Sequence, residues 1–137
     1  IAPKNLMAEF RKAHQFIVFC VNHPMQYALA EYIKNEQNYL QLSSFYQQKR
    51  DYFNSLIKDS RFETLPSKGT YFELLRYKNI TNIPDTEFAV ELTQKHKIAS
   101  IPVSVFYHQK VDEKVLRFCV AKKEETLLRA AEILNKV

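Results

Sequence analysis

The chain has 137 residues, of which 46% are hydrophobic and 26% charged, a balance typical of a globular domain rather than a disordered one. No apolar run approaches the roughly 20 residues that a membrane span needs. The net charge of +5 comes from 20 Lys and Arg interleaved with 15 Asp and Glu, which is more typical of solvated helix faces than of a nucleic-acid patch.

Two further features of the composition narrow the class of protein. Gly69 is the only glycine, which excludes a glycine-rich phosphate loop of the usual kind. Cys20 and Cys119 are the only cysteines, so we expect a reducing compartment, no disulfide framework, and both thiols in the core. The start at Ile1 has no basic leader and suggests a piece of a longer protein.

Three helices are expected in the first 60 residues. Pro3 is suited to the first turn of a helix over 3–15, and Asn22 can cap a second helix over 24–36. An apolar stripe that includes Phe45 and Tyr46 and lacks proline and glycine predicts one long helix over 39–59. The charged residues 49–51, among them Arg50, are expected on its opposite, solvated face. The second helix is expected to bury Met25, Leu29, Tyr32 and Ile33.

From Arg61 onward the hydrophobic period changes to two, and Gly69 provides a turn residue able to take a positive φ. The elements expected after this turn are a strand over 70–77, a helix capped by Asp85 and ending near Lys97, a brief strand with an irregular segment over 98–107, a strand over 114–120 and a helix over 123–136.

The order of these elements predicts an α/β (α+β) sandwich, in which helices pack on a short mixed sheet. The apolar faces of the first three helices are too long to be buried entirely against so small a sheet. They indicate a further domain or subunit outside this sequence, with a compact helical lobe as the alternative.

Most candidate reactive groups have an ordinary structural explanation. The four histidines lack the spacing of a metal-binding pair. Cys20 and His23 lie three residues apart without a third group to orient them, so packing explains them. Glu124 and Glu125 open a predicted helix, where negative charge complements the helix dipole.

Arg117 differs from these candidates. Strand alternation places Leu116 and Phe118 on one face of the predicted strand. Arg117 lies on the other face, between Val115 and Cys119. A guanidinium among apolar neighbours needs an anion, and its planar fork suits a carboxylate. The pattern alone favours a solvent-facing edge arginine over this interpretation.

Six segments occur in the order of a known family. They are 2–15, 19–26 (FCVNHPMQ), 45–51 (FYQQKRD), 65–72 (LPSKGTYF), 101–107 (IPVSVFY) and 116–127 (LRFCVAKKEETL). Together they resemble the class I/II, fold-type-I aminotransferases that depend on pyridoxal phosphate, most closely the methionine and kynurenine aminotransferase branch. The resemblance implies helices over 1–37 that pack on a cofactor domain absent here, a linking helix over 38–60, and a small substrate-side domain over 61–137.

The resemblance also implies roles for single residues. In that family an arginine of the C-terminal strand binds the substrate α-carboxylate, and Arg117 has its position. Phe19, with Cys20 beside it, resembles an aromatic position that reaches the neighbouring subunit's substrate pocket, which implies a homodimeric parent. The positions that resemble pocket-lining ones are Tyr71, Phe72 and Phe106, for which hydrophobic packing is an equally good account.

The family's cofactor-binding lysine has no counterpart in this chain. It lies in a Ser-x-x-Lys stretch followed by a glycine-containing turn, upstream of the segment that resembles Ala2-Pro3-Lys4, as do the groups that bind the cofactor phosphate. We therefore expect this chain to bind no pyridoxal phosphate and to be inactive.

The expected parent is a cytoplasmic homodimeric enzyme. It would transfer an amino group between methionine, glutamine, an aromatic amino acid or kynurenine and a 2-oxo acid, without a metal, nucleic acid or membrane partner. The competing interpretations are a free-standing α/β binding or interaction module without catalysis and, third, a basic nucleic-acid binder.

Overall fold

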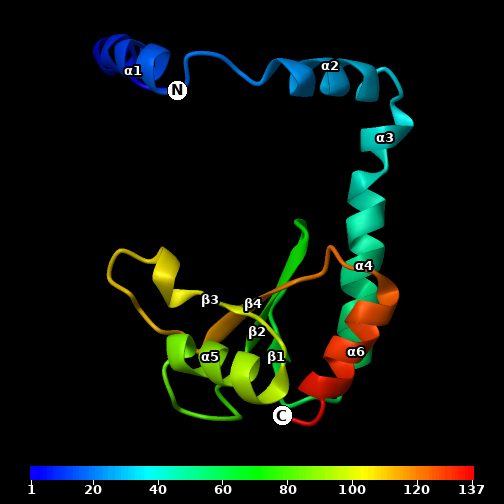
Figure 1. Cartoon of the computed structure of the whole chain (residues 1–137). Helices are drawn as coiled ribbons and strands as arrows, with labels where there is room; N and C mark the ends of the chain where they lie inside the picture. Colours follow the sequence, from blue (N-terminus) through cyan, green and yellow to red (C-terminus); the bar gives the residue numbers. More distant parts are fainter. The chain divides into compact units, whose positions relative to one another are not determined.

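The computed structural model describes all residues from Ile1 to Val137, which form two compact units (Figure 1). Unit 1 covers Ile1–Gln41 and unit 2 covers Leu42–Val137, and each is described by itself. None of the helices combines the length and the apolar character that crossing a membrane would require.

Unit 1 consists of three helices, α1 (Lys4–Ile17), α2 (His23–Tyr32) and α3 (Gln37–Leu40). The predicted cap of α2 is confirmed, because the Asn22 side chain accepts a hydrogen bond from the backbone N–H of Met25 at 3.1 Å. The two hydrogen bonds that tie α2 to α3 join the side chains of Tyr32 and Asn38 to each other's backbone carbonyls.

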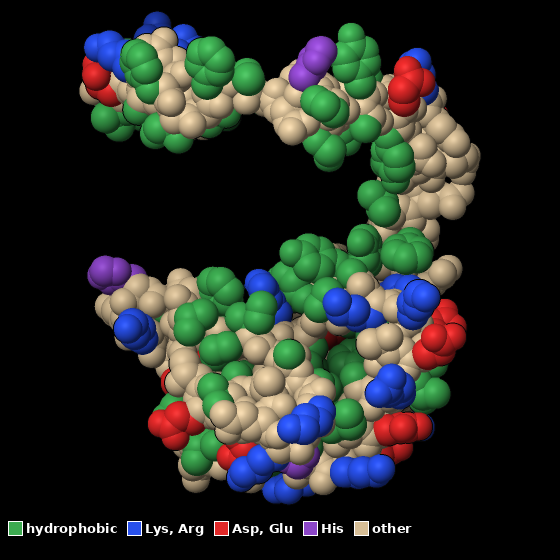
Figure 2. Space-filling model, in the orientation of Figure 1, with side chains coloured by type: hydrophobic (Ala, Val, Ile, Leu, Met, Phe, Trp, Pro, Cys, Tyr) green, Lys and Arg blue, Asp and Glu red, His purple; other side chains and the backbone are tan.

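No residue of the unit 1 helices is buried. The expectation that α2 buries its apolar face is therefore wrong within this chain. The four residues expected to be buried are all at least half exposed, at 56% for Met25, 55% for Leu29, 50% for Tyr32 and 58% for Ile33. Figure 2 shows hydrophobic side chains along α1 and α2 at the surface. A 41-residue unit with three short helices has too little surface to enclose a core of its own.

The single helix expected over 39–59 is interrupted. α3 ends at Leu40, Gln41 has φ −88° and ψ −2°, and α4 begins at Leu42. These angles belong to a turn rather than a continuous α-helix. Neither proline nor glycine marks the break.

Unit 2 contains three helices, four short strands and one 3-10 turn. They are α4 (Leu42–Ile57), β1 (Glu63–Thr64), β2 (Phe72–Arg76), α5 (Asp85–His96), β3 (Ile101–Pro102), the 3-10 turn η1 (Ser104–Phe106), β4 (Val115–Cys119) and α6 (Glu124–Leu134). The sheet order is β1-β2-β4-β3. The predicted α/β class is confirmed.

The sheet differs from the prediction in one respect, since all its pairings are antiparallel rather than mixed. The chain reaches β4 from β2 through α5 and β3, and β4 then runs opposite to both of its neighbours. The order of elements along the chain does not determine these directions.

The core of unit 2 lies between the sheet and α4, α5 and α6. Its strand residues are Leu75 of β2 with Leu116 and Phe118 of β4, each at most 4% exposed. The helices contribute Phe53, Ile57, Phe88, Leu92, Leu127, Ala131 and Leu134. The three helices therefore cover one face of the sheet, and the alternate strand residues point to the other face.

Two local predictions need correction. Gly69 does not have a positive φ; the next residue, Thr70, takes it, at 71°. Asp85 is the first residue of α5 rather than its cap, and its carboxylate accepts hydrogen bonds from Ser104 instead of from the helix. At Asp85, hydrogen bonds from the distant residue Ser104 outweigh the local preference for capping the helix. At Gly69, the turn itself places the positive φ on the following residue.

Candidate anion-binding site

Arg117 lies in the middle of β4, the strand flanked on both sides. Its backbone is paired with Leu74 of β2 and with Ile101 of β3. Since Leu116 and Phe118 point into the core, the Arg117 side chain lies on the face that the helices of unit 2 leave uncovered. The predicted alternation of this strand is thus confirmed, and Arg117 is half-buried.

Two aromatic rings hold the guanidinium. Its Cζ atom lies 4.8 Å from the ring centroid of Phe72 and 5.1 Å from that of Phe106. Each contact of this kind contributes about 0.5–2 kcal/mol, depending on how far water is excluded. The rings fix the guanidinium while leaving its N–H groups available to an anion.

No protein anion uses those N–H groups. The ion pairs of the structure do not include Arg117, whose guanidinium lies against the Phe72 and Phe106 rings. A half-buried cation without a counter-ion favours binding an external anion, and a planar fork matches the two oxygens of a carboxylate. The site is therefore suited to a carboxylate ligand.

A row of aromatic residues leads from α4 to this site. Ring centroids are 5.1 Å apart between Phe45 and Tyr46, 6.3 Å between Tyr46 and Tyr71, and 5.6 Å between Tyr71 and Phe72. Of these, the sequence singled out Tyr71 and Phe72. The structure places Phe72 against Arg117, and Tyr71 contacts the Phe72 ring. It missed Phe45 and Tyr46, whose helical spacing placed them on a buried stripe, although both lie in a segment that carries the family resemblance.

The acid of β2 points away from Arg117. Glu73 is 1% exposed on the helix-covered face, and its Oε1 lies 3.7 Å from Nε of Arg50 in α4. Burial raises the pKa of the Glu73 carboxyl group, and the neighbouring Arg50 acts against that shift. Arg50 also donates hydrogen bonds to the Thr70 carbonyl and to Oε1 of Gln47. The sequence placed Arg50 on a solvated face, which is wrong: it is 3% exposed and joins α4 to β2.

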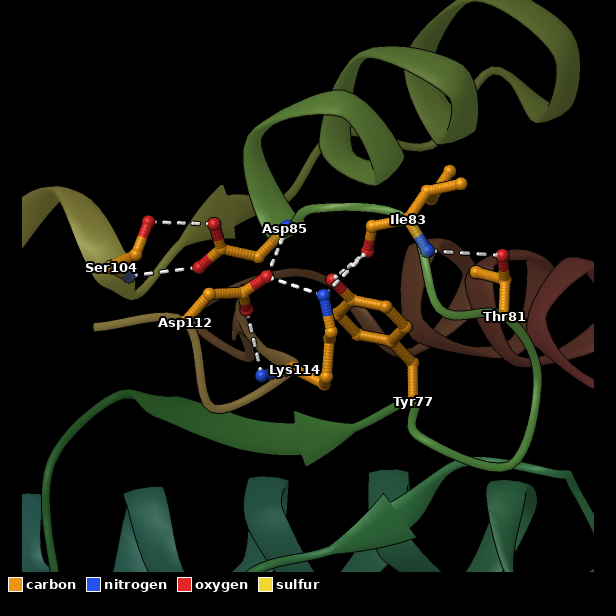
Figure 3. A network of polar contacts seen from close by, with 7 residues as sticks. All are labelled: Tyr77, Thr81, Ile83, Asp85, Ser104, Asp112 and Lys114. Carbon is orange, nitrogen blue, oxygen red and sulfur yellow. Dashed lines mark hydrogen bonds and ion pairs between the residues drawn. The ribbon is translucent and has the colours of Figure 1, made fainter. Parts of the chain in front are cut away.

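A second polar network lies between α5, η1 and the loop before β4 (Figure 3). Partial burial acts to raise the pKa of Asp112, but hydrogen bonds from the Lys114 ammonium (2.6 Å) and backbone N–H (2.8 Å) lower it. The Tyr77 hydroxyl donates to the Ile83 carbonyl at 2.9 Å, and burial raises the pKa of Tyr77. These charges are satisfied within the protein.

The remaining predicted site residues lie in unit 1. Phe19 is 89% exposed and has φ 59°, and Cys20 beside it is exposed. Their role in a substrate pocket stays an expectation. Cys119 is exposed too, so the prediction of two core thiols is wrong. Cys119 is exposed because it follows the core residue Phe118 in β4, so that its side chain points to the uncovered face of the sheet.

A cavity of about 340 Å³ also occurs in unit 2. Phe53, Phe118 and Leu127, all core residues, are among its lining residues, and Arg117 is not. The lining is largely apolar and has no acidic side chain, and its basic residues, Lys97, Lys122 and Arg129, are all exposed to solvent. We therefore take the Arg117 face, rather than this cavity, as the candidate site.

Comparisons with known proteins agree with this fold. Residues 1–134 match the family model of aminotransferase class I and II. The chain is 46% identical over 138 residues to the methionine aminotransferase of Escherichia coli (strain K12), an alignment that covers 100% of this chain and 36% of that protein. It is 28% identical over 159 residues to the kynurenine–oxoglutarate transaminase of Dictyostelium discoideum, covering 100% of this chain and 37% of that protein.

Solved structures show the same likeness. The crystal structure of YbdL from Escherichia coli, identified as a methionine aminotransferase, matches with a TM-score of 0.85 at 46% identity, over 100% of this chain and 36% of that one. The N-succinyldiaminopimelate aminotransferase of Mycobacterium tuberculosis matches with a TM-score of 0.83 at 28% identity, over 98% of this chain and 36% of that one.

Fold and site together define a small α/β domain with one half-buried arginine that has no protein counter-ion. The family match assigns it: the chain belongs to the aminotransferase class I and II family. It spans a little over a third of the length of the relatives that it matches.

Proposed function

We propose that this chain is the C-terminal part of a pyridoxal-phosphate-dependent amino-acid aminotransferase, in which Arg117 binds the α-carboxylate of the substrate. The observation that carries the proposal is the guanidinium held between Phe72 and Phe106 without a protein anion. Family membership and the names of the relatives support the same assignment.

Arg117 contributes binding and orientation. Two parallel, charge-assisted hydrogen bonds from its fork hold both carboxylate oxygens, and this fixes the direction of the neighbouring Cα–H bond. The amino acid and the 2-oxo acid carry the same group next to the reacting carbon, so one arginine serves both. Pyridoxal phosphate supplies the electron-sink chemistry of such enzymes.

The residues of this chain do not by themselves fit that cofactor. Gly69 is the only glycine and lacks a positive φ, so the chain has no glycine-rich phosphate cradle. Ser55 and Lys58 have a Ser-x-x-Lys spacing, but Lys58 is exposed in the turn that follows α4, and no glycine-containing turn follows it. We propose that the cofactor lysine and the phosphate-binding groups belong to a part of the parent outside this chain.

Further features of the parent follow from the same proposal. The exposed apolar faces of α1 and α2 would pack on its cofactor domain, and Phe19 and Cys20 would approach the pocket of a second subunit in a homodimer. We propose a cytoplasmic enzyme. Its amino-acid substrates would be of the methionine, glutamine, aromatic or kynurenine type, since the relatives are named for methionine and kynurenine.

The test compares arginine variants in the complete parent enzyme. Arg117→Ala should raise KM for the amino acid and lower kcat/KM by about 30- to 900-fold, equivalent to about 2–4 kcal/mol for a lost charged hydrogen-bonded pair. Arg117→Lys should give values of KM and kcat/KM between those of the unmodified enzyme and Arg117→Ala, because lysine keeps the charge but lacks the planar fork of arginine. Arg129→Ala, on the exposed side of α6, is the matched control and should leave both constants unchanged.

Two results would contradict the proposal. An unchanged KM in Arg117→Ala would move the carboxylate site elsewhere in the enzyme. Saturable transamination by the isolated 137-residue chain with added pyridoxal phosphate would refute the missing cofactor domain. Carboxylate binding by a protein that consists of this chain alone would instead favour a free-standing binding module.

A further inference from the structure

The position of Phe106 depends on a short and otherwise weakly held segment. η1 is a single turn of three residues, and the Phe106 side chain is 60% exposed. Its backbone N–H donates to the Val103 carbonyl at 3.1 Å. Since little packing holds the Phe106 ring, the position of the ring over Arg117 depends on the contacts that fix the backbone of η1.

One buried carboxylate fixes that backbone. Asp85, the first residue of α5, accepts a hydrogen bond from the Ser104 N–H at 2.8 Å and another from the Ser104 hydroxyl at 2.6 Å. Asp85 is 1% exposed and Ser104 is 6% exposed. Figure 3 shows the carboxylate directed at the first residue of η1. Hydrogen bonds to an ionised acceptor, shielded from water, are among the stronger ones in proteins.

The same end of α5 is tied to the loop on the other side of η1. The backbone N–H of Asp85 donates to Oδ2 of Asp112 at 3.3 Å, and Asp112 pairs with Lys114 just before β4. The segment that carries Phe106 is thereby attached at its start to α5, and its far end leads through the same network into the strand of Arg117.

We propose that Asp85 and Ser104 are positioning residues for the carboxylate site: they hold η1 so that Phe106 covers the Arg117 guanidinium and orients its fork. The inference rests on the proposed role of Arg117 as the carboxylate-binding residue. Neither Asp85 nor Ser104 touches the substrate. Asp85 acts through Ser104, and Ser104 acts through the ring two residues further along.

The test uses the complete parent enzyme and two probes that compete with the amino acid, the carboxylate hexanoate and its neutral counterpart hexanamide. Ser104→Ala removes the hydroxyl bond to Asp85 and should raise the inhibition constant of hexanoate about three- to tenfold, as expected for a modest coupling. The inhibition constant of hexanamide should not change. Ser104→Thr retains the hydroxyl and should restore hexanoate binding.

A double-mutant cycle identifies the route of the effect. Phe106→Ala should weaken hexanoate binding, and adding Ser104→Ala to that variant should have no further effect if Ser104 acts only through the ring. Additive effects would overturn the proposal. Equal weakening of hexanoate and hexanamide by Ser104→Ala would overturn it as well, since that is the result of general structural damage.

The Arg117→Ala variant separates the two proposals. If it leaves the hexanoate constant unchanged, the proposed function of Arg117 fails. If it weakens hexanoate binding while Ser104→Ala does not, Arg117 keeps its role and only the positioning role of Asp85 and Ser104 is wrong.

Discussion

Replacing either partner of the buried pair between Arg50 and Glu73 should destabilise unit 2 to different extents. Arg50 Nε lies 3.7 Å from Glu73 Oε1, and the two side chains are 4% and 1% exposed. At an effective dielectric constant of about 20, their attraction is about 4–5 kcal/mol. Arg50→Met leaves the buried Glu73 carboxylate without its cation and should cost about 3–5 kcal/mol near neutral pH. The Asn54 side chain also acts against the rise in the Glu73 pKa, and it remains in this variant.

The reverse substitution should cost less. In Glu73→Gln the arginine keeps its hydrogen bonds to the Thr70 carbonyl and the Gln47 side chain, so we expect a loss of roughly 1–3 kcal/mol. The difference in unfolding free energy between the two variants measures how much the unpaired carboxylate destabilises the folded state.

The difference should also depend on pH. Burial raises the pKa of Glu73 above its ordinary value of 4.5, so the folded state holds this proton more tightly than the unfolded state. The contribution of Glu73 to stability is therefore complete below about pH 4.5 and decreases as pH rises through the folded pKa, by at most about 1.4 kcal/mol per pH unit. Arg50→Met removes the opposing cation, so its deficit should shrink on acidification. Glu73→Gln should lose this pH dependence.

The assay is urea unfolding of the 137-residue chain followed by far-UV circular dichroism, because the chain has no tryptophan. Unfolding is compared near pH 5 and near pH 7, with Glu132→Gln as the control at an exposed glutamate of α6. Equal losses for Arg50→Met and Glu73→Gln at both pH values would refute the argument from the buried charge.

Three further predictions concern other parts of unit 2. Lys97 ends α5 with φ 60°, so Lys97→Gly should raise the free energy of unfolding by about 1 kcal/mol in urea, whereas Gln94→Gly inside the helix should lower it by up to about 1 kcal/mol. Leu127 is 2% exposed and its neighbour Leu128 41%, so Leu127→Ala should lower the unfolding free energy by about 2–5 kcal/mol and Leu128→Ala by less than about 1, measured in the same way. The pKa of Asp112 is lowered from 3.8, so its stabilising contribution is present above pH 3.8 and lost as pH falls through the folded pKa; acid titration of Asp112→Asn should lack this loss, and an unchanged acid transition would contradict it.

The sequence predicted the features that depend on neighbouring residues. The cap at Asn22, the end of α5 near Lys97 and the alternation around Arg117 each follow from a local preference, and the structure confirms them. The strand pattern alone favoured a solvent-facing edge residue at Arg117, and the family resemblance reversed that preference. Its side chain is indeed half-buried, which the strand pattern alone did not establish.

The features that the sequence did not predict depend on contacts between distant residues. Arg50 looked like part of a charged surface, because nothing near it indicates that Glu73 of a later strand would meet it in the core. The role of Asp85 was misassigned for the same reason, since Ser104 lies 19 residues further along. The break at Gln41 has no residue signal of its own.

The anchoring of Arg117 bears on how a ligand would be recognised. Its backbone is fixed by hydrogen-bonded partners on both sides, and its tip already lies between two rings before any ligand arrives. A free arginine side chain loses about 2 kcal/mol of rotamer entropy when it is immobilised. Here most of that loss takes place during folding, so under the proposed role of Arg117 a carboxylate ligand would gain affinity through preorganisation rather than through additional contacts.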